Sequence, residues 1–190
     1  PNVFPTPETY HPGQTSFYGA SKIACEGFIE AFCEAYGMQA WMYRFVSIQG
    51  ERHPHGVTYD FVKKLKQNPK ELEILGDGTA RKSYLYIGDC VAGFFMGFEK
   101  ASAKTNLFNL GHEEFIDVKS VANIITDEMG LKDVEYKFTG GQRGWIGDSP
   151  LVHLDTGKIR ALGWKPTVNI EETIRRTVRW LLENPYVYKR

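Results

Sequence analysis

The sequence predicts an α/β fold, and three observations support that prediction. Helix-like and strand-like patterns alternate along the 190 residues instead of forming separate runs of one kind. A hydrophobic content of 42%, with 14% aromatic residues, is enough for a substantial core. Near the N-terminus a long helical pattern is followed directly by an apolar strand pattern, which is the order found in parallel sheets.

The first predicted element is a helix over residues 17–36. The residues before it are rich in Pro, Thr and Gly, which indicates a loop. Ser16 directly precedes the helical pattern, and Gly37 supplies its C-terminal stop. The apolar positions of the pattern recur at spacings of three and four, as one face of a helix requires: Ile23, Ala24, Phe28, Ala31, Phe32 and Ala35.

Residues 39–48 form a β-rich apolar run that is interrupted by one arginine. We predict a buried strand here, and a parallel one, because it follows a helix. Residues 50–56 are rich in turn formers. A mild boundary therefore falls near Gly50, with a long helix and a buried strand before it and smaller mixed elements after it.

Shorter elements alternate over the rest of the chain. Asp89 is expected to cap the N-terminus of a helix over residues 91–100, and Asp117 or Val118 to open another that ends at Met129. Further helices are predicted at 59–67, 154–162 and 170–183. Strands are predicted at 73–75, 82–87, 106–110 and 134–138, and residues 140–150 form a glycine-rich loop.

Composition excludes several classes of protein. The formal net charge is zero, so nothing favours a nucleic-acid partner. No apolar run approaches the length of a membrane span, and the first residues lack the features of a signal peptide. The three cysteines, Cys25, Cys33 and Cys90, show no CxxC spacing. We expect reduced thiols in a cytoplasmic protein that has no membrane partner.

Two short patterns are not interpreted as sites. His53-Pro54-His55 has no Cys or carboxylate at metal-ligand spacing, so no metal site is expected there. Gly76-Asp77-Gly78 lacks the Lys-Ser/Thr pair of a phosphate-binding loop and predicts a turn.

The pattern that suggests chemistry is the pentad that begins at Tyr18 and ends at Lys22. Residues four apart on a helix share a face, so the phenol and the ammonium are expected to be neighbours. A phenol is normally too weak an acid to act as a base at neutral pH, but a nearby ammonium stabilises its phenolate. Such a pair can accept and return a proton at an alcohol or ketone while a cofactor moves hydride.

The surroundings of this pentad resemble one enzyme family. The segments TSFYGASKIACEGFIEAF and MYRFVSIQGER resemble the extended short-chain dehydrogenases/reductases, in the branch called the NAD-dependent epimerase/dehydratase family. The segments GDGTARKSYLYIGDCV, GQRGWIGDSP and LDTGKIRALGWKPTVNIEETIRRTVRWL continue the resemblance in order to the C-terminus. The fold so implied is the C-terminal part of a Rossmann-like parallel sheet (residues 1–50) and a smaller mixed α/β substrate-binding domain (mainly residues 51–190).

The resemblance also implies roles for particular residues. Tyr18 is the acid/base, Lys22 also holds the nicotinamide ribose of NAD, and Arg44 belongs to the same cofactor region. Ser47 stands where the family usually has an Asn that touches the substrate diphosphate. The implied substrate-binding residues are Ser47, Val57, Phe61, Arg81, Arg143 and Asp148, of which the two arginines hold the diphosphate and Asp148 a ribose hydroxyl.

The implied activity is that of an NAD-dependent nucleotide-sugar epimerase of the UDP-glucose 4-epimerase type, which works through a 4-keto intermediate on a UDP-sugar or another NDP-sugar. An NDP-sugar dehydratase, decarboxylase or reductase of the same family, and a non-catalytic sugar-nucleotide-binding fragment, stay open. The glycine-rich dinucleotide fingerprint does not occur in these residues. We therefore expect a homodimer, or association with an N-terminal segment that carries the fingerprint.

Overall fold

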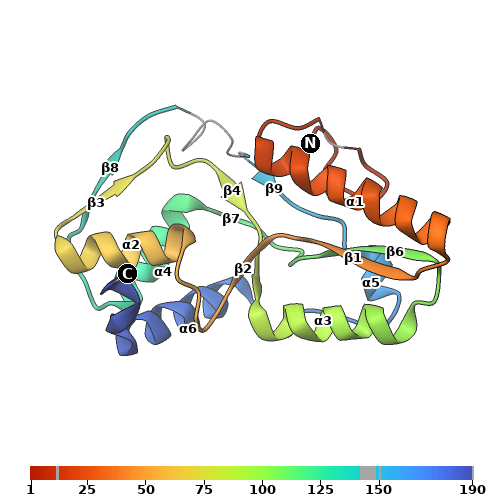
Figure 1. Ribbon diagram of the computed structural model, residues 1–190. Helices are drawn as coiled ribbons and strands as arrows, with labels where there is room; N and C mark the ends of the chain where they lie inside the picture. The colour runs from red at the N-terminus through yellow and green to blue at the C-terminus, as the bar shows by residue number, and fades with distance from the viewer. Residues whose placement is uncertain (12, 142–148, 150, 190) are drawn as a thin grey trace.

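The computed structural model describes residues 1–11, 13–141, 149 and 151–189, and it arranges them around two hydrophobic cores (Figure 1). We call the part around strands β1 and β6 the sheet lobe and the part around helices α2, α4 and α6 the helical lobe. The chain passes between them several times, so the core of the sheet lobe contains residues from both sides of Gly50.

The sheet lobe is built on two parallel strands, β1 (Ala40–Phe45) and β6 (Thr105–Leu110). Helix α1 (Phe17–Tyr36) covers one face of this pair, and α3 (Ile87–Lys100) with the short α5 (Gly157–Arg160) covers the other (Figure 1). The parallel α/β prediction is therefore confirmed.

The predicted bounds of α1 are confirmed, and its two ends show why. The Ser16 hydroxyl accepts a hydrogen bond from the Gly19 N–H at 3.1 Å, which satisfies one of the first free donors of the helix. At the other end Gly37 adopts a left-handed conformation with φ 66°, which glycine reaches without steric cost.

The single strand predicted over residues 39–48 is wrong in one respect, because the run divides into β1 and β2 (Ser47–Gln49). The Val46 N–H still bonds the Leu110 carbonyl at 3.1 Å. Beyond that point the chain leaves β6, and β2 pairs in parallel with β5 (Tyr84–Tyr86) instead. This change of partner carries Ser47 out of the sheet lobe and toward the junction of the two lobes.

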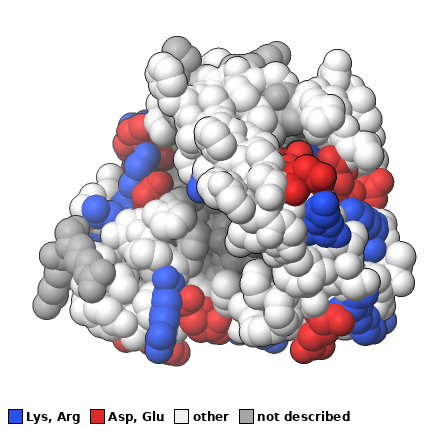
Figure 2. Space-filling model, turned by 45° about the vertical axis from the view of Figure 1, so that its right-hand side comes forward, with Lys and Arg blue, Asp and Glu red and all other residues white. Residues whose placement is uncertain are grey.

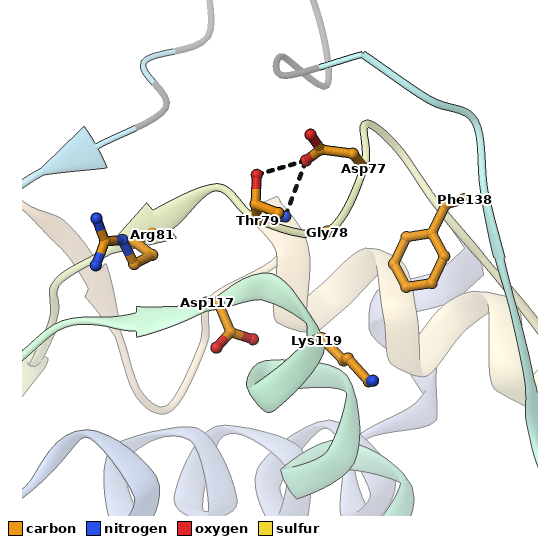
Figure 3. A pocket seen from close by; sticks show the side chains of 7 residues that line it. All are labelled: Asp77, Gly78, Thr79, Arg81, Asp117, Lys119 and Phe138. Carbon is orange, nitrogen blue, oxygen red and sulfur yellow. Dashed lines mark hydrogen bonds between the residues drawn. The ribbon is translucent and has the colours of Figure 1, made fainter.

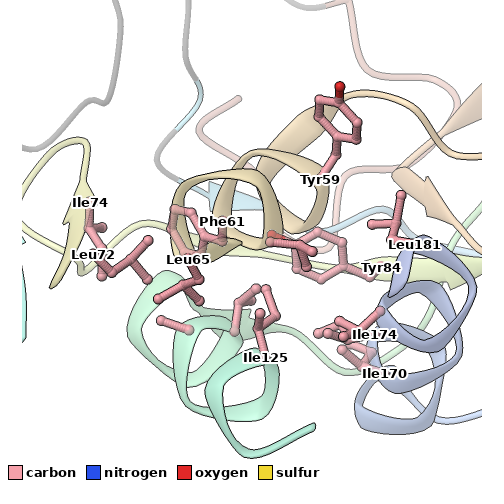
Figure 4. Packing of buried hydrophobic residues seen from close by; sticks show 14 of the residues in the cluster. Tyr59, Phe61, Leu65, Leu72, Ile74, Tyr84, Ile125, Ile170, Ile174 and Leu181 are labelled. Carbon is pink, nitrogen blue, oxygen red and sulfur yellow. The ribbon is translucent and has the colours of Figure 1, made fainter. Parts of the chain in front are cut away.

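The helical lobe packs α2 (Gly56–Gln67), α4 (Val118–Glu128) and α6 (Ile170–Glu183) against one another. Its core includes Leu65, Leu72, Ile125 and Ile174, all buried, and Figure 4 shows them converging between the three helices. The 3-10 helix η1 (Pro185–Lys189) closes the C-terminal end.

Short strands complete the fold beside these helices. Strand β3 (Glu71–Ile74) pairs in parallel with β8 (Glu135–Phe138). Strand β4 (Arg81–Lys82) lies between β7 (Ile116–Asp117), which is antiparallel to it, and β9 (Leu151–Val152), which is parallel. The strand predicted at 82–87 therefore consists of β4 and β5, each with a different partner.

Asp89 corrects the sequence interpretation, because it is not a helix cap. Helix α3 begins two residues earlier, at Ile87. The buried Asp89 carboxylate accepts hydrogen bonds from the Thr167 N–H (3.0 Å), the Thr167 hydroxyl (2.7 Å) and the Val168 N–H (3.1 Å). It thereby fixes the start of α3 to the chain just before α6, across the two lobes.

Two further features concern membrane-spanning helices and disulfide bonds. No helix in the described part of the chain is both long and apolar enough to cross a bilayer. The thiols of Cys25, Cys33 and Cys90 are all free.

Asp89→Ala tests the carboxylate that joins the lobes. Because it leaves three donors without their acceptor, we expect the free energy of unfolding to fall by about 2–4 kcal/mol. Urea denaturation followed by circular dichroism measures it. Glu99→Ala, on the exposed side of the same helix, is the matched control and should leave the midpoint unchanged. Equal effects of both substitutions would contradict the role of Asp89.

Candidate active site

Tyr18 and Lys22 lie on the first two turns of α1 and are neighbours, as their spacing predicts. The Lys22 ammonium nitrogen is 5.2 Å from the centre of the Tyr18 ring. Tyr18 is 72% exposed and Lys22 is also exposed, so both side chains can reach a bound molecule. Helix α1 starts near the junction of the lobes and runs away from it, which puts its first turn on the side of the helical lobe (Figure 1).

One turn beyond Lys22, on the same helix face, Glu26 joins α1 to the sheet. Its carboxylate accepts two hydrogen bonds from the Arg44 guanidinium, at 2.8 Å from Nε and 2.6 Å from Nη2. The side chains of Arg44 and Glu26 are only 19% and 21% exposed. The hydrogen bond to Glu26 is the main reason why the pKa of Arg44 lies above its usual value.

Arg44, predicted as a cofactor-binding residue, is thus engaged with the protein itself. Its Nη1 also donates to the backbone carbonyls of Glu8 (3.1 Å) and Tyr10 (3.3 Å). On the neighbouring strand Asn109 is paired in register with Arg44, and its side chain donates to the Thr6 carbonyl at 2.9 Å. Together these bonds hold the N-terminal loop against α1 and β1.

A second group of predicted residues meets at the junction of the lobes. Ser47 and Val57 line a cavity of about 420 Å³, together with His53, His55 and Lys82. Val57 and Lys82 also line an adjoining cavity of about 700 Å³, which contains Phe61. The structure therefore brings together three of the predicted substrate-binding residues, Ser47, Val57 and Phe61.

Arg81 does not share these two cavities. Successive residues of a strand point to opposite faces, so Arg81 turns away from the side that Lys82 faces. It lies over the Phe115 ring at 5.1 Å and lines a separate cavity of about 520 Å³ with Asp117 and Lys119 (Figure 3). Arg143 and Asp148 lie outside the described residues.

Lys82 is the residue that sequence reasoning missed. The available signal was strand alternation, because Lys82 and the buried Tyr84 are two apart and line the same cavity. The chemistry that results is simple: an ammonium and the Ser47 hydroxyl beside apolar side chains can hold an anion linked to a flat or apolar group.

Known proteins resemble this chain over most of its length. The sequence pattern of the NAD dependent epimerase/dehydratase family matches residues 2–111. The chain is 29% identical over 188 residues to a putative UDP-glucose 4-epimerase of Methanocaldococcus jannaschii, covering 97% of this chain and 59% of that protein. It is 29% identical over 182 residues to the dTDP-D-glucose 4,6-dehydratase of Mus musculus, covering 92% of this chain and 50% of that protein.

The fold is also similar to that of a solved structure. The crystal structure of UDP-glucose 4-epimerase with UDP-glucose from Thermotoga maritima superposes with a TM-score of 0.82 at 30% identity, over 96% of this chain and 59% of that one. The chain thus spans between half and three fifths of the length of these three proteins.

A double-mutant cycle tests the Arg44–Glu26 pair. With Arg44→Met, Glu26→Gln and the double variant, we expect a coupling free energy of about 1–3 kcal/mol in urea denaturation, because the pair is bidentate and mostly buried.

The matched control is the pair of Lys104 and Glu34, which also joins α1 to the sheet lobe but is 51% and 79% exposed. It should show no resolvable coupling. Equal coupling in the two cycles would mean that burial of Arg44 does not matter.

Proposed function

The chain belongs to the NAD dependent epimerase/dehydratase family, and on that premise we propose that it carries the acid–base pair and the sugar-nucleotide site of an NAD-dependent epimerase that acts on a UDP-sugar. The observation that carries the proposal is the exposed Tyr18 phenol with the Lys22 ammonium 5.2 Å from its ring. The similarity to a putative UDP-glucose 4-epimerase favours this sugar nucleotide.

In the proposed reaction Tyr18 takes the proton from a sugar hydroxyl while the carbon that bears it becomes a ketone. The Lys22 ammonium stabilises the phenolate form of Tyr18, which is the form that accepts this proton. Tyr18 then returns the proton after the keto-sugar has turned over and its other face has been reduced. NAD, when bound, supplies the hydride acceptor and donor.

The residues at the start of α1 fit that cofactor. Both Tyr18 and Lys22 are exposed on one side of the helix, so a nicotinamide ribose can reach the Lys22 ammonium. Arg44 would contribute indirectly, by fixing α1 through Glu26.

The substrate is proposed to occupy the junction of the lobes. Lys82 and Ser47 would face its diphosphate, because a cation and a hydroxyl line the same cavity. Val57 and Phe61, in the adjoining cavity, would contact the uridine. Arg143 and Asp148 keep their proposed roles toward the nucleotide, whereas Arg81 lines the separate cavity on the opposite side of β4, so the role proposed for it at the diphosphate passes to Lys82.

A second candidate is an NDP-sugar dehydratase, decarboxylase or reductase, favoured by the 29% identity to a dTDP-D-glucose 4,6-dehydratase. A third is a sugar-nucleotide-binding chain without hydride chemistry. Product analysis separates these: an epimerase interconverts UDP-glucose and UDP-galactose, a dehydratase releases a 4-keto-6-deoxy sugar, and the third yields no product and retains no NAD on purification.

We also propose that the protein is cytoplasmic and that this chain associates with a second copy of itself or with a segment that completes its sheet. Large apolar side chains stay exposed on helices α1 and α3 of the sheet lobe, among them Phe28, Phe32, Phe94 and Phe98. Within the described residues β1 pairs with β6 alone. With the sheet lobe turned forward, the middle of the surface is mainly uncharged (Figure 2). An apolar surface beside an open strand edge favours a second copy or a segment that completes the sheet.

Tyr18→Phe tests the chemistry. It should abolish turnover of UDP-glucose by the protein that carries this chain and leave UDP-glucose binding nearly unchanged, because only the proton-transferring hydroxyl is lost. Tyr36→Phe is the matched control, since Tyr36 lies on the same helix and is also 72% exposed. Activity retained in Tyr18→Phe would refute the catalytic assignment.

Size-exclusion chromatography with light scattering tests association. The 190-residue chain should elute as a dimer or larger species, or in complex with the completing segment. Phe32→Ser should weaken the association, whereas Phe138→Ser, an exposed phenylalanine of β8, should not. A stable monomer would contradict this part of the proposal.

A further inference from the structure

Strand β2 buries an amide side chain in the wall of the cavity that contains Ser47. Gln49 is only 2% exposed, and it lines this cavity together with Ser47. The two residues are two apart in β2, so their side chains point to the same face of the strand. The face of β2 that borders the cavity therefore carries a hydroxyl and an amide, and the amide has no role in the function proposed above.

One end of the Gln49 amide is held by helix α2. The Thr58 hydroxyl, which is fully buried, donates a hydrogen bond to Gln49 Oε1 at 2.7 Å. None of the described residues accepts a hydrogen bond from Gln49 Nε2. A buried donor without an acceptor costs free energy unless a bound molecule or a water satisfies it. The amide nitrogen is thus a fixed donor that the protein itself leaves unsatisfied in the wall of the cavity.

The first turn of α2 borders the same cavity. Gly56 and Val57 line it, and the N-cap residue His55 makes no side-chain capping hydrogen bond. The first N–H groups of a helix have no partner within the helix, and together with the helix dipole they favour a negatively charged group. The Gln49 amide and the start of α2 therefore present hydrogen-bond donors to one space, which suits a group that only accepts hydrogen bonds.

We propose that Gln49 is a further substrate-binding residue, whose side-chain amide donates a hydrogen bond to a phosphate oxygen of the nucleotide sugar. A phosphate oxygen is the matching group because it accepts hydrogen bonds and carries negative charge, which strengthens the bond. The Thr58 hydroxyl keeps the carbonyl end of the amide on the protein, so the nitrogen end is left for the ligand. This inference rests on the proposed function, because it needs the diphosphate to lie beside Ser47.

Isothermal titration calorimetry of the protein that carries this chain is the test, with UDP-glucose and uridine as separate ligands. Gln49→Met removes the donor and keeps an unbranched side chain of similar length in the wall. It should weaken UDP-glucose binding by roughly 10- to 100-fold, the range expected for a hydrogen bond to a charged group. Uridine, which has no phosphate, should bind Gln49→Met as tightly as it binds the unaltered protein.

Gln49→Glu adds a readout that a change of packing would not produce. The introduced carboxyl can still accept from the Thr58 hydroxyl, but it repels a phosphate when it is ionised and can donate to one when it is protonated. Burial raises the pKa of a carboxyl, so the affinity of this variant relative to the unaltered protein should be lowest near about pH 8 and should recover toward about pH 5.5. Neither phosphate of UDP-glucose titrates in this range.

Gln39→Met is the matched control. Gln39 belongs to the sheet lobe and lies outside this cavity, and its Nε2 donates to the Ala103 carbonyl at 2.9 Å. This substitution exchanges the same two side chains where the amide nitrogen already has an acceptor within the protein. It should leave the binding of both UDP-glucose and uridine unchanged at every pH.

The outcomes distinguish this inference from the function on which it rests. Undiminished UDP-glucose binding in both Gln49 variants would overturn the inference and leave the proposed function standing. An equal loss of uridine binding in Gln49→Met would do the same, because the effect would then not involve a phosphate. No binding of UDP-glucose by the unaltered protein would overturn both.

Discussion

The Arg44 guanidinium is the contact on which the proposed active site depends. It joins strand β1, helix α1 through Glu26, and the N-terminal loop through the carbonyls of Glu8 and Tyr10. Apolar packing contributes less to holding α1 against the sheet, since Cys33 is the one described residue of α1 that is buried. Because Tyr18, Lys22 and Glu26 follow one another at spacings of four, an ion pair at Glu26 also sets the direction in which the Tyr18 phenol faces.

The two lobes contribute different chemistry to the proposed site. The sheet lobe supplies the Tyr18–Lys22 pair on a helix that starts near the junction of the lobes. The junction supplies Ser47, Lys82 and the two histidines around one cavity. The junction exists because the chain changes its pairing partner after β1, so that β2 pairs with β5. The Asp89 carboxylate, in the first turn of α3, holds the two lobes together. A nucleotide sugar that bridges the lobes would contact both the Tyr18–Lys22 pair and the residues of the junction.

Helices were predictable from the sequence where a local signal marks their ends. Ser16 and Asp117 are N-caps that bond their own helices, and α6 occupies the predicted residues 170–183. Long-range choices were not predictable. Asp89 carries a side chain suited to capping, yet its acceptors are used by Thr167 and Val168, nearly eighty residues away. Which of Arg81 and Lys82 faces the cavity of Ser47 was not predictable either. That choice depends on the register of β4 between β7 and β9.

The most direct measurement of the central claim is a crystal structure of the protein with UDP-glucose bound. The account predicts the diphosphate beside Lys82 and Ser47, the uridine beside Val57 and Phe61, and the sugar directed toward Tyr18. A nucleotide bound on the opposite side of β4, in the cavity of Arg81, Asp117 and Lys119, with its sugar away from α1, would contradict it.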